Sequence, residues 1–420
     1  MKTILSFLIT LWFGLGVLSA PTSLKRRSFK IESVRRSNTI SGPAALRRAY
    51  VKYGIIPTDI GLDLEDFEPI IKAAVTDTNK DVVEPDLTGA VSALSVQGDA
   101  AFVSPITIGG QELVVTFDTG SSDLWVMNTR LPSASIEGRP AYDPSKSTTF
   151  KNLEGATFNI TYGDDSFAYG GVGTETINVG GVSVAGQAIG LPSSVSSSFL
   201  EDTYTNGLVG LGFSTLNTIQ PQRQRSFFET IAEVLDEPVL GASLVSDGVG
   251  EYEFGLIDQT KFKGELVNAS VDASSGFWKF ESAWYRVGDG ELTKNDQATA
   301  TIADTGTSLM LLDQLVVDAY YAKVHGAQYV ASATGYIYPC SAELPNFAIA
   351  VGSQHLATVP GSLINFSEVG TNTTTGEAVC YGGIQSNQGL DMQILGDSFL
   401  KAFYVVFDLR GPSIGVASPA

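Results

Sequence analysis

Apolar and polar residues alternate over much of the chain, a pattern typical of short β-strands. Residues 106–117 alternate on both sides of a Gly-Gly pair, which predicts a hairpin that turns at Gly109–Gly110. Residues 174–186 show the same arrangement around Gly180–Gly181 and predict a second hairpin. The 44 glycines among 420 residues fit a chain with many such turns.

Helical periodicity is confined to a few segments. We expect helices over 226–235 and 311–324. A third is expected near the N-terminus, where apolar residues recur every three or four positions, at Ala44, Leu46, Ala49, Tyr50 and Tyr53. Because the strand-like segments dominate, we predict an all-β protein with a few short helices.

The first twenty residues have the pattern of a signal peptide. A lysine precedes an almost unbroken apolar run over 4–18, and small residues follow at 19–20. A membrane span needs about 20 apolar residues, so this run is too short to serve as one. We therefore predict a signal peptide over 1–20 and a secreted protein without a membrane anchor. Vacuolar delivery is the alternative, since a signal peptide alone does not separate the two destinations.

Composition narrows the classes of function. Only 17% of the residues are charged and 43% are hydrophobic, so the chain can bury a large core. The net charge of −19 argues against nucleic acid as a partner. His325 and His355 stand alone in the sequence, which argues against a His-rich zinc site. We expect neither a metal nor a cofactor.

Secretion would place the cysteines and the glycosylation motifs in an oxidising compartment. Cys340 and Cys380 are then expected to form a disulfide, with two buried free thiols as the alternative. The motif Asn-X-Ser/Thr marks candidate glycosylation sites at Asn159, Asn268, Asn365 and Asn372. Of these, Asn159 is the least expected, because it lies in a strand-like run.

Charge divides the chain into a basic leader and an acidic body. Residues 21–52 hold nine Lys or Arg and one acid, whereas residues 87–420 hold 14 Lys or Arg and 35 Asp or Glu, a net charge of −21. We expect the leader to fold onto the body at neutral pH and to loosen in acid. The alternative is a solvated basic tail. Residues 75–96 read as a linker, so we place a pro-segment at 21–88.

An internal duplication divides the body into halves. The sequence Asp-Thr-Gly at 118–120 recurs at 304–306, and each copy is followed by two apolar residues and a glycine, at 208–210 and 394–396. The distance from the aspartate to that glycine is 92 residues in both copies. Equal spacing predicts two homologous lobes that each contribute one aspartate. We place them at 89–265 and 266–420.

The two aspartates are the candidate catalytic residues. A pseudo-twofold axis would bring Asp118 and Asp304 together, and carboxylates about 3 Å apart share one proton. One then serves as a base and the other as an acid, which suits activation of water and protonation of a leaving amine. A lone Asp-Thr-Gly is more often an ordinary turn. The expected supporting residues are Thr119, Gly120, Ser121, Thr305, Gly306 and Thr307.

The residues at 118–125 and 304–308 resemble the two signatures of pepsin-family aspartic endopeptidases. Within that family the chain is most similar to secreted fungal enzymes of the penicillopepsin and aspergillopepsin type. The resemblance runs from about residue 101 to the C-terminus. It implies a bilobal pepsin-like fold with a cleft for protein and peptide substrates. It also implies a zymogen that is activated by acid and an enzyme that is inhibited by pepstatin-type compounds. The sequence gives no sign of an oligomer, and we expect a monomer.

The resemblance also implies a flap over the cleft at 158–170. Tyr162 and Gly163 would lie over the aspartates, Trp125 would bond to Tyr162, and Asp164 would accept a basic residue before the cleaved bond. The chain departs from its family at Asp165, where a glycine is usual. Hydrophobic substrate residues are expected against Phe199 and Leu208, whose alternative role is ordinary core packing.

In the leader, residues 47–54 resemble the inhibitory end of family pro-segments. Lys52 would place its ammonium against the two carboxylates, with Tyr53 beside it. The alternative is a lysine on the surface.

Two other functions compete with the endopeptidase. Residues 396–399 resemble the box of certain serine hydrolases, but both histidines lie upstream and the chain has no Gly-X-Ser-X-Gly elbow. A catalytically impaired pepsin-fold binding protein is the second alternative. Both aspartates and both following hydroxyl residues are present, which favours the enzyme.

Overall fold

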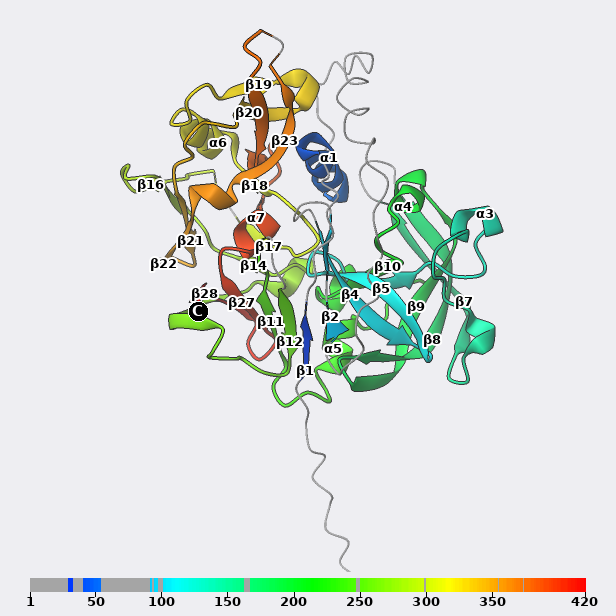
Figure 1. Cartoon of the computed structure of the whole chain (residues 1–420). Helices are drawn as coiled ribbons and strands as arrows, with labels where there is room; N and C mark the ends of the chain where they lie inside the picture. The colour runs from blue at the N-terminus through cyan, green and yellow to red at the C-terminus, as the bar shows by residue number, and fades with distance from the viewer. Residues whose placement is uncertain are drawn as a thin grey trace, which may run out of the picture.

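The computed structural model describes residues 29–32, 41–53, 91–92, 94–96, 101–161, 167–246, 250–297, 300–353, 355–372 and 374–420. Strands dominate this part of the chain and form two lobes, which confirms the predicted all-β class (Figure 1). The predicted signal peptide at 1–20 lies outside the described residues, as do Tyr162, Gly163, Asp164 and Asp165 of the predicted flap.

The first half of the body forms an eight-stranded sheet. Both predicted hairpins are present in it, and the glycines at their turns adopt the positive φ angles that such turns require. In sheet order, the strands are β3 (Leu94–Val96), β4 (Ala101–Ile108), β5 (Gln111–Asp118), β10 (Gly207–Gly210), β6 (Leu124–Val126), β9 (Val182–Val195), β8 (Phe167–Val179) and β7 (Lys151–Thr161).

The second half forms three smaller sheets. The five-stranded one contains β14 (Lys279–Phe280), β17 (Thr301–Ala303), β26 (Gln393–Leu395), β18 (Met310–Leu312) and β25 (Ile384–Ser386). One four-stranded sheet contains β16 (Thr293–Lys294), β15 (Trp284–Val287), β21 (Phe347–Val351) and β22 (His355–Val359). The other contains β19 (Gln328–Val330), β20 (Gly335–Pro339), β24 (Ala378–Gly382) and β23 (Asn365–Thr371).

A seven-stranded sheet joins the two halves (Figure 1). It takes strands from both halves and from the leader: β13 (Phe262–Ser270), β28 (Ser413–Pro419), β27 (Tyr404–Asp408), β11 (Val239–Ser243), β12 (Glu251–Phe254), β1 (Phe29–Glu32) and β2 (Val91–Ser92). The leader therefore contributes a strand to the body. The lobe limits predicted at 265 and 266 fall within β13 and stay a prediction.

The helices are short. The α-helices are α1 (Gly42–Lys52), α3 (Ser133–Ile136), α4 (Ser197–Glu201), α5 (Phe227–Ile231), α6 (Gln314–Tyr321) and α7 (Asp397–Leu400). The 3-10 turns are η2 (Pro144–Lys146), η3 (Ser214–Leu216), η4 (Ala273–Ser275), η5 (Ala331–Ala333) and η6 (Gly361–Leu363). The helix predicted over 311–324 was wrong at its start, because Leu311 and Leu312 belong to β18. A buried strand that leads straight into a helix gives one continuous apolar pattern.

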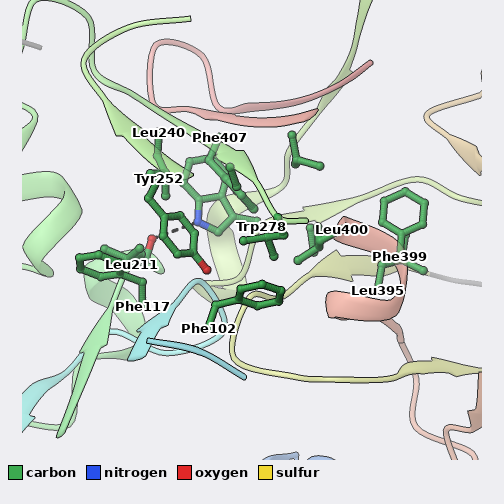
Figure 2. Close-up of a cluster of buried hydrophobic side chains, with 14 of the residues drawn as sticks. Phe102, Phe117, Leu211, Leu240, Tyr252, Trp278, Leu395, Phe399, Leu400 and Phe407 are labelled. Carbon is green, nitrogen blue, oxygen red and sulfur yellow. Dashed lines mark hydrogen bonds between the residues drawn. The ribbon is translucent and has the colours of Figure 1, made fainter. Parts of the chain in front are cut away.

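The main hydrophobic core lies where the sheets meet. Trp278 is completely buried, packs 5.2 Å from Phe407 between ring centroids, and donates its indole N–H to the carbonyl oxygen of Leu211 at 3.1 Å (Figure 2). Phe117 packs in the same cluster, 5.4 Å from Tyr252. Because Phe117 directly precedes Asp118, core packing also fixes the position of that aspartate.

The predicted disulfide between Cys340 and Cys380 is present and links the residue after β20 to β24. The four candidate glycosylation sites, Asn159, Asn268, Asn365 and Asn372, are all exposed, and their modification stays a prediction. Asn159 does lie in a strand, β7. Within the described ranges, no helix combines the length and the apolar character needed to cross a membrane.

Candidate active site

Asp118 and Asp304 occupy equivalent places at the ends of strands. Asp118 is the last residue of β5 and pairs with Gly210 of β10, which runs parallel to β5. Asp304 follows β17, which runs parallel to β26. A Cβ atom on Gly210 would lie 2.5 Å from the Cα of Ser122, and one on Gly396 would lie 2.2 Å from the carbonyl oxygen of Thr307. The spacing of 92 residues thus places a glycine where each aspartate loop needs close backbone contact.

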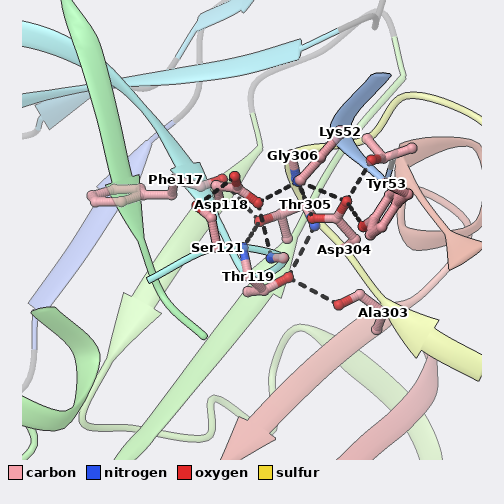
Figure 3. Close-up of polar contacts among 12 residues, drawn as sticks. Lys52, Tyr53, Phe117, Asp118, Thr119, Ser121, Ala303, Asp304, Thr305 and Gly306 are labelled. Carbon is pink, nitrogen blue, oxygen red and sulfur yellow. Dashed lines mark hydrogen bonds and ion pairs between the residues drawn. The ribbon is translucent and has the colours of Figure 1, made fainter. Parts of the chain in front are cut away.

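Two threonines tie the loops together across the seam (Figure 3). The backbone N–H of Thr119 donates to Oγ1 of Thr305 at 3.1 Å, and the N–H of Thr305 donates to Oγ1 of Thr119 at 3.0 Å. Each hydroxyl in turn donates to a backbone carbonyl of the opposite loop, at Ala303 or Phe117. These reciprocal bonds are buried, so they hold the two aspartates at a fixed separation.

Each carboxylate accepts the same pair of hydrogen bonds. The N–H of Gly120 donates to Oδ1 of Asp118 at 2.8 Å, and the hydroxyl of Ser121 donates to Oδ2 at 2.7 Å. The N–H of Gly306 donates to Oδ1 of Asp304 at 3.0 Å, and the hydroxyl of Thr307 donates to Oδ2. Both aspartates are at most 1% exposed. Their orientation is therefore set before any ligand binds.

The two glycines of the loops have no room for a side chain. A Cβ atom on Gly120 would lie 2.5 Å from Oδ1 of Asp304, and one on Gly306 would lie 2.3 Å from Oδ1 of Asp118. Each glycine therefore lets the carboxylate of the opposite loop approach its own backbone. This contact explains why both copies of the motif carry glycine at this position.

The leader closes the site. The ammonium Nζ of Lys52 lies 2.6 Å from Oδ1 of Asp118 and 2.8 Å from both carboxylate oxygens of Asp304 (Figure 3). The hydroxyl of Tyr53 donates to Oδ2 of Asp304 at 2.5 Å. One small cation thus contacts both carboxylates at once, and the side chains of Lys52 and Tyr53 fill the space in front of them.

Burial and the leader drive the two carboxyl groups apart in pKa. Burial raises the pKa of Asp118 to about 6, against the opposing attraction of Lys52. Burial also acts on Asp304, but Lys52 and the hydrogen bonds from its neighbours outweigh it and lower that pKa to about 2. The two groups titrate as a pair. Between those values, the pair holds one proton and one negative charge beside Lys52.

Helix α1 positions Lys52, which ends it. Its apolar side chains, at Ala45, Leu46, Ala49 and Tyr50, are buried against residues of the second half, including Ile302, Leu311, Phe366, Tyr381 and Ile394. The hydroxyl of Tyr50 also donates to the carbonyl oxygen of Ser386 at 2.7 Å. The helix lies between the two lobes (Figure 1). Its apolar face therefore anchors the leader to the lobe that carries Asp304.

The first half supplies an apolar wall beside Asp118. Trp125 pairs with Leu208 across β6 and β10, and its ring packs against Phe199 with centroids 4.9 Å apart. All three residues and Asp118 line a cavity of about 150 Å³. The indole nitrogen of Trp125 is buried and meets no hydrogen-bond partner among the described residues. Its predicted partner, Tyr162, lies outside them.

Two further acidic residues lie at the site, although the sequence did not predict a role for either. Asp123 is 3% exposed and accepts hydrogen bonds from Asn217 and Thr218, which brace the loop after Asp118. Burial raises its pKa to about 6. Asp202 lines the cavity beside Asp118. Asp123 does not stand out in the sequence, because both of its partners are more than 90 positions away.

In the described ranges, no cluster of three or more His, Cys, Asp or Glu is placed to hold a metal.

Comparison with known proteins gives one consistent family. The family model for eukaryotic aspartyl protease matches residues 101–419. An aspergillopepsin A-like aspartic endopeptidase of Aspergillus fumigatus is 63% identical over the whole length of both chains. Aspergillopepsin-1 of Aspergillus flavus is 41% identical over 94% of this chain and 92% of its own. Endothiapepsin of Cryphonectria parasitica is 40% identical over 98% of each chain.

Proposed function

Because the chain belongs to the eukaryotic aspartyl protease family and is an aspartic endopeptidase, we propose that Asp118 and Asp304 are its catalytic pair. The observation that carries this proposal is the position of Lys52, whose single ammonium contacts both carboxylates at 2.6 and 2.8 Å. An ammonium group is about as large as a water molecule. A water at the same position would lie within hydrogen-bond distance of both carboxylates, as an attacking water must. Once the leader has left, a water can occupy it.

The chemistry follows from one proton shared by two carboxyl groups. The ionised aspartate takes a proton from the water as the water oxygen attacks the carbonyl carbon of the peptide. The protonated aspartate gives its proton to the carbonyl oxygen, so a tetrahedral diol forms. The aspartate that took the water proton then protonates the amine nitrogen, the other aspartate takes a proton from a hydroxyl of the diol, and the carbon–nitrogen bond breaks to leave a carboxylic acid and an amine. No covalent bond to the protein forms in these steps.

The leader makes the intact chain a zymogen in this proposal. Residues 1–20 direct secretion and residues 21–88 form the pro-segment, in which Lys52 and Tyr53 occupy the site at neutral pH. Acid protonates the carboxylates that hold Lys52, and the basic leader loses its attraction to the acidic body. Cleavage near the end of the pro-segment then leaves the two lobes at 89–265 and 266–420 as the mature enzyme.

The substrates are peptides and proteins with hydrophobic residues next to the cleaved bond. Phe199 and Leu208 beside Trp125 offer an apolar surface close to Asp118, which favours such side chains. The flap at 158–170 would close over the peptide, and Asp164 would accept a lysine before the cleaved bond. Asp165 adds a second charge next to it.

A proteolysis assay tests this function. Secreted, acid-treated protein is incubated with a denatured protein substrate at pH 3–5, with and without pepstatin and beside the Asp304→Asn variant. We expect cleavage by the wild-type enzyme that is abolished by pepstatin and by the substitution. A folded enzyme without its leader that cleaves nothing would contradict the proposal and favour a binding protein.

A further inference from the structure

The cavity beside Asp118 has an acidic side chain that the proposed chemistry does not use. Asp202 lies at the C-terminal end of α4, and Nη2 of Arg48 from the leader lies 3.8 Å from its Oδ2. We propose that in the mature enzyme Asp202 binds a basic side chain, arginine or lysine, of the substrate peptide. This assignment rests on the proposed function, because it concerns which peptides the aspartate pair cleaves.

The leader pairs one cation with each acid of this cavity. Asp118 and Asp202 are the acidic residues among those that line it in the described part of the chain. Lys52 contacts Asp118 and Arg48 contacts Asp202, and both cations come from one face of α1. When the leader departs, both acids lose the cation that the leader supplies. Asp118 then serves the reaction, and Asp202 is left facing the space that the substrate enters.

The segment that carries Asp202 is held firmly by its own contacts. The guanidinium of Arg139 donates to the backbone carbonyl oxygens of Phe199 and Asp202, and the N–H of Asp202 donates to the carbonyl oxygen of Ser198 at 3.2 Å. The N–H of Tyr204 donates to Oδ1 of Asp202 at 3.1 Å. Oδ1 is thereby engaged within the loop, while Oδ2 is the atom that faces Arg48.

Exposure indicates that the carboxylate is the sheltered member of the ion pair. With the leader in place, the side chain of Asp202 is 17% exposed, whereas that of Arg48 is 45% exposed. A cation that reaches a sheltered carboxylate gains more than one that pairs in open solvent. The nearby charge of Arg139 opposes a second cation, but its N–H groups are used on backbone carbonyls. Apolar Phe199 and Leu208 would cover the aliphatic part of a lysine or arginine.

Matched peptides test the assignment. In a fluorogenic peptide, each residue on the amino side of the cleaved bond is replaced in turn by arginine and by citrulline, its uncharged isostere. The mature wild-type enzyme is assayed with each pair at pH 5. We expect kcat/KM for arginine to exceed that for citrulline by about fivefold at one position. Asp202→Asn should bring this ratio close to one, and Asp202→Glu should largely restore it.

Glu201→Gln is the control, because Glu201 is the exposed acid next to Asp202 and does not line the cavity. Its ratio should match that of the wild type. Equal cleavage of both peptides by the wild-type enzyme at every position would overturn the assignment while leaving the proposed function intact. A variant Asp202→Asn that keeps every arginine preference of the wild type would also overturn it, whereas a preference at the residue directly before the cleaved bond that depends on Asp164 should survive in this variant. Failure of the wild-type enzyme to cleave any of the peptides would instead contradict the proposed function.

Discussion

The two aspartate loops make the same hydrogen bonds, but the leader contacts them differently. In each loop the carboxylate accepts one bond from a glycine N–H and one from a hydroxyl, and each threonine bonds to the opposite loop. Tyr53, however, donates to Asp304, and Lys52 contacts both oxygens of Asp304 but one oxygen of Asp118. The apolar face of α1 also packs on the half that carries Asp304.

This difference separates what the fold provides from what the leader adds. The duplicated fold supplies two equivalent carboxylates at a fixed separation. Lys52 lowers the pKa of both aspartates, but it outweighs burial only at Asp304, whereas burial still raises the pKa of Asp118. When the leader departs, the inequality that depends on Lys52 and Tyr53 departs with it, and the pair is free to share a proton with water.

The same pKa values give the sign of the effect of pH. Asp304 has a lowered pKa, so its ionised form stabilises the folded chain. This stabilisation is complete above about pH 4, the ordinary pKa of an aspartate, and is lost as the pH falls toward 2. Asp118 has a raised pKa of about 6, so its protonated form stabilises the folded chain. This stabilisation is greatest below the ordinary pKa of an aspartate and is lost as the pH rises through 6. Strong acid therefore removes the charge that holds Lys52.

The largest expected effect tests whether the two loops are equivalent in catalysis. Asp118→Asn and Asp304→Asn should each lower kcat of the mature enzyme by at least about a thousandfold, because either change removes the acid–base pair. Steady-state kinetics on a fluorogenic peptide measures this loss. Asp289→Asn, in an exposed turn, is the control. Tenfold or smaller loss in one of the two variants would show that the loops do not act as a pair.

The next effect tests whether the packing of α1 on the second half anchors the leader. Leu46 is completely buried against the second half, so Leu46→Ala should weaken leader docking by about 2–5 kcal/mol. The intact chain should then begin to cleave a fluorogenic peptide at a higher pH than the wild type. Leu292→Ala, at a half-exposed leucine away from the leader, should leave that pH unchanged. An unchanged onset in Leu46→Ala would mean that α1 does not anchor the leader.

A smaller effect compares the hydroxyls of the two loops. Ser121→Ala and Thr307→Ala each remove a hydroxyl that donates to one aspartate and favours its ionised form, so the pKa of that aspartate rises. The acidic limb of the pH–rate profile should move up by about one pH unit. The shift should be larger for Thr307, which is more deeply buried. Ser121→Thr and Thr307→Ser retain the hydroxyl and should keep the wild-type profile, and profiles that all coincide would refute this role.

The smallest effect concerns a contact that only Asp304 makes with the leader. Tyr53→Phe removes the hydroxyl that helps to keep Asp304 ionised, so the carboxyl should accept a proton at a higher pH. The onset of activity in the intact chain should rise by less than about one pH unit. Tyr336→Phe, which removes a hydroxyl that donates to Asp318 and not to the aspartate pair, is the control. A lower onset in Tyr53→Phe would contradict the proposed sign.

Local pattern was enough to predict some of this molecule. The hairpin turns at Gly109–Gly110 and Gly180–Gly181 follow from neighbouring residues, and the repeated Asp-Thr-Gly motif pointed to equivalent loops at Asp118 and Asp304. The start of the helix predicted at 311 was wrong, because buried strand and helix residues look alike in sequence.

Contacts between distant segments were beyond prediction from pattern. Arg48 and Asp202 are separated by 154 positions, and no periodicity connects them. Asp123 with Thr218 and Tyr50 with Ser386 likewise meet only because the lobes and the leader fold together. Lys52 was placed by its resemblance to a family motif, and its contacts with both aspartates depend on how α1 docks.

The most direct test of the account is the latency of the intact chain when Lys52 is replaced. Lys52→Ala removes the ammonium between the carboxylates, and Lys146→Ala removes an exposed lysine as a control. The initial rate of cleavage of a fluorogenic peptide is measured at pH 6, before any processing of the leader. We expect measurable activity for Lys52→Ala and none for the wild type or the control. Unchanged latency in Lys52→Ala would contradict this expectation.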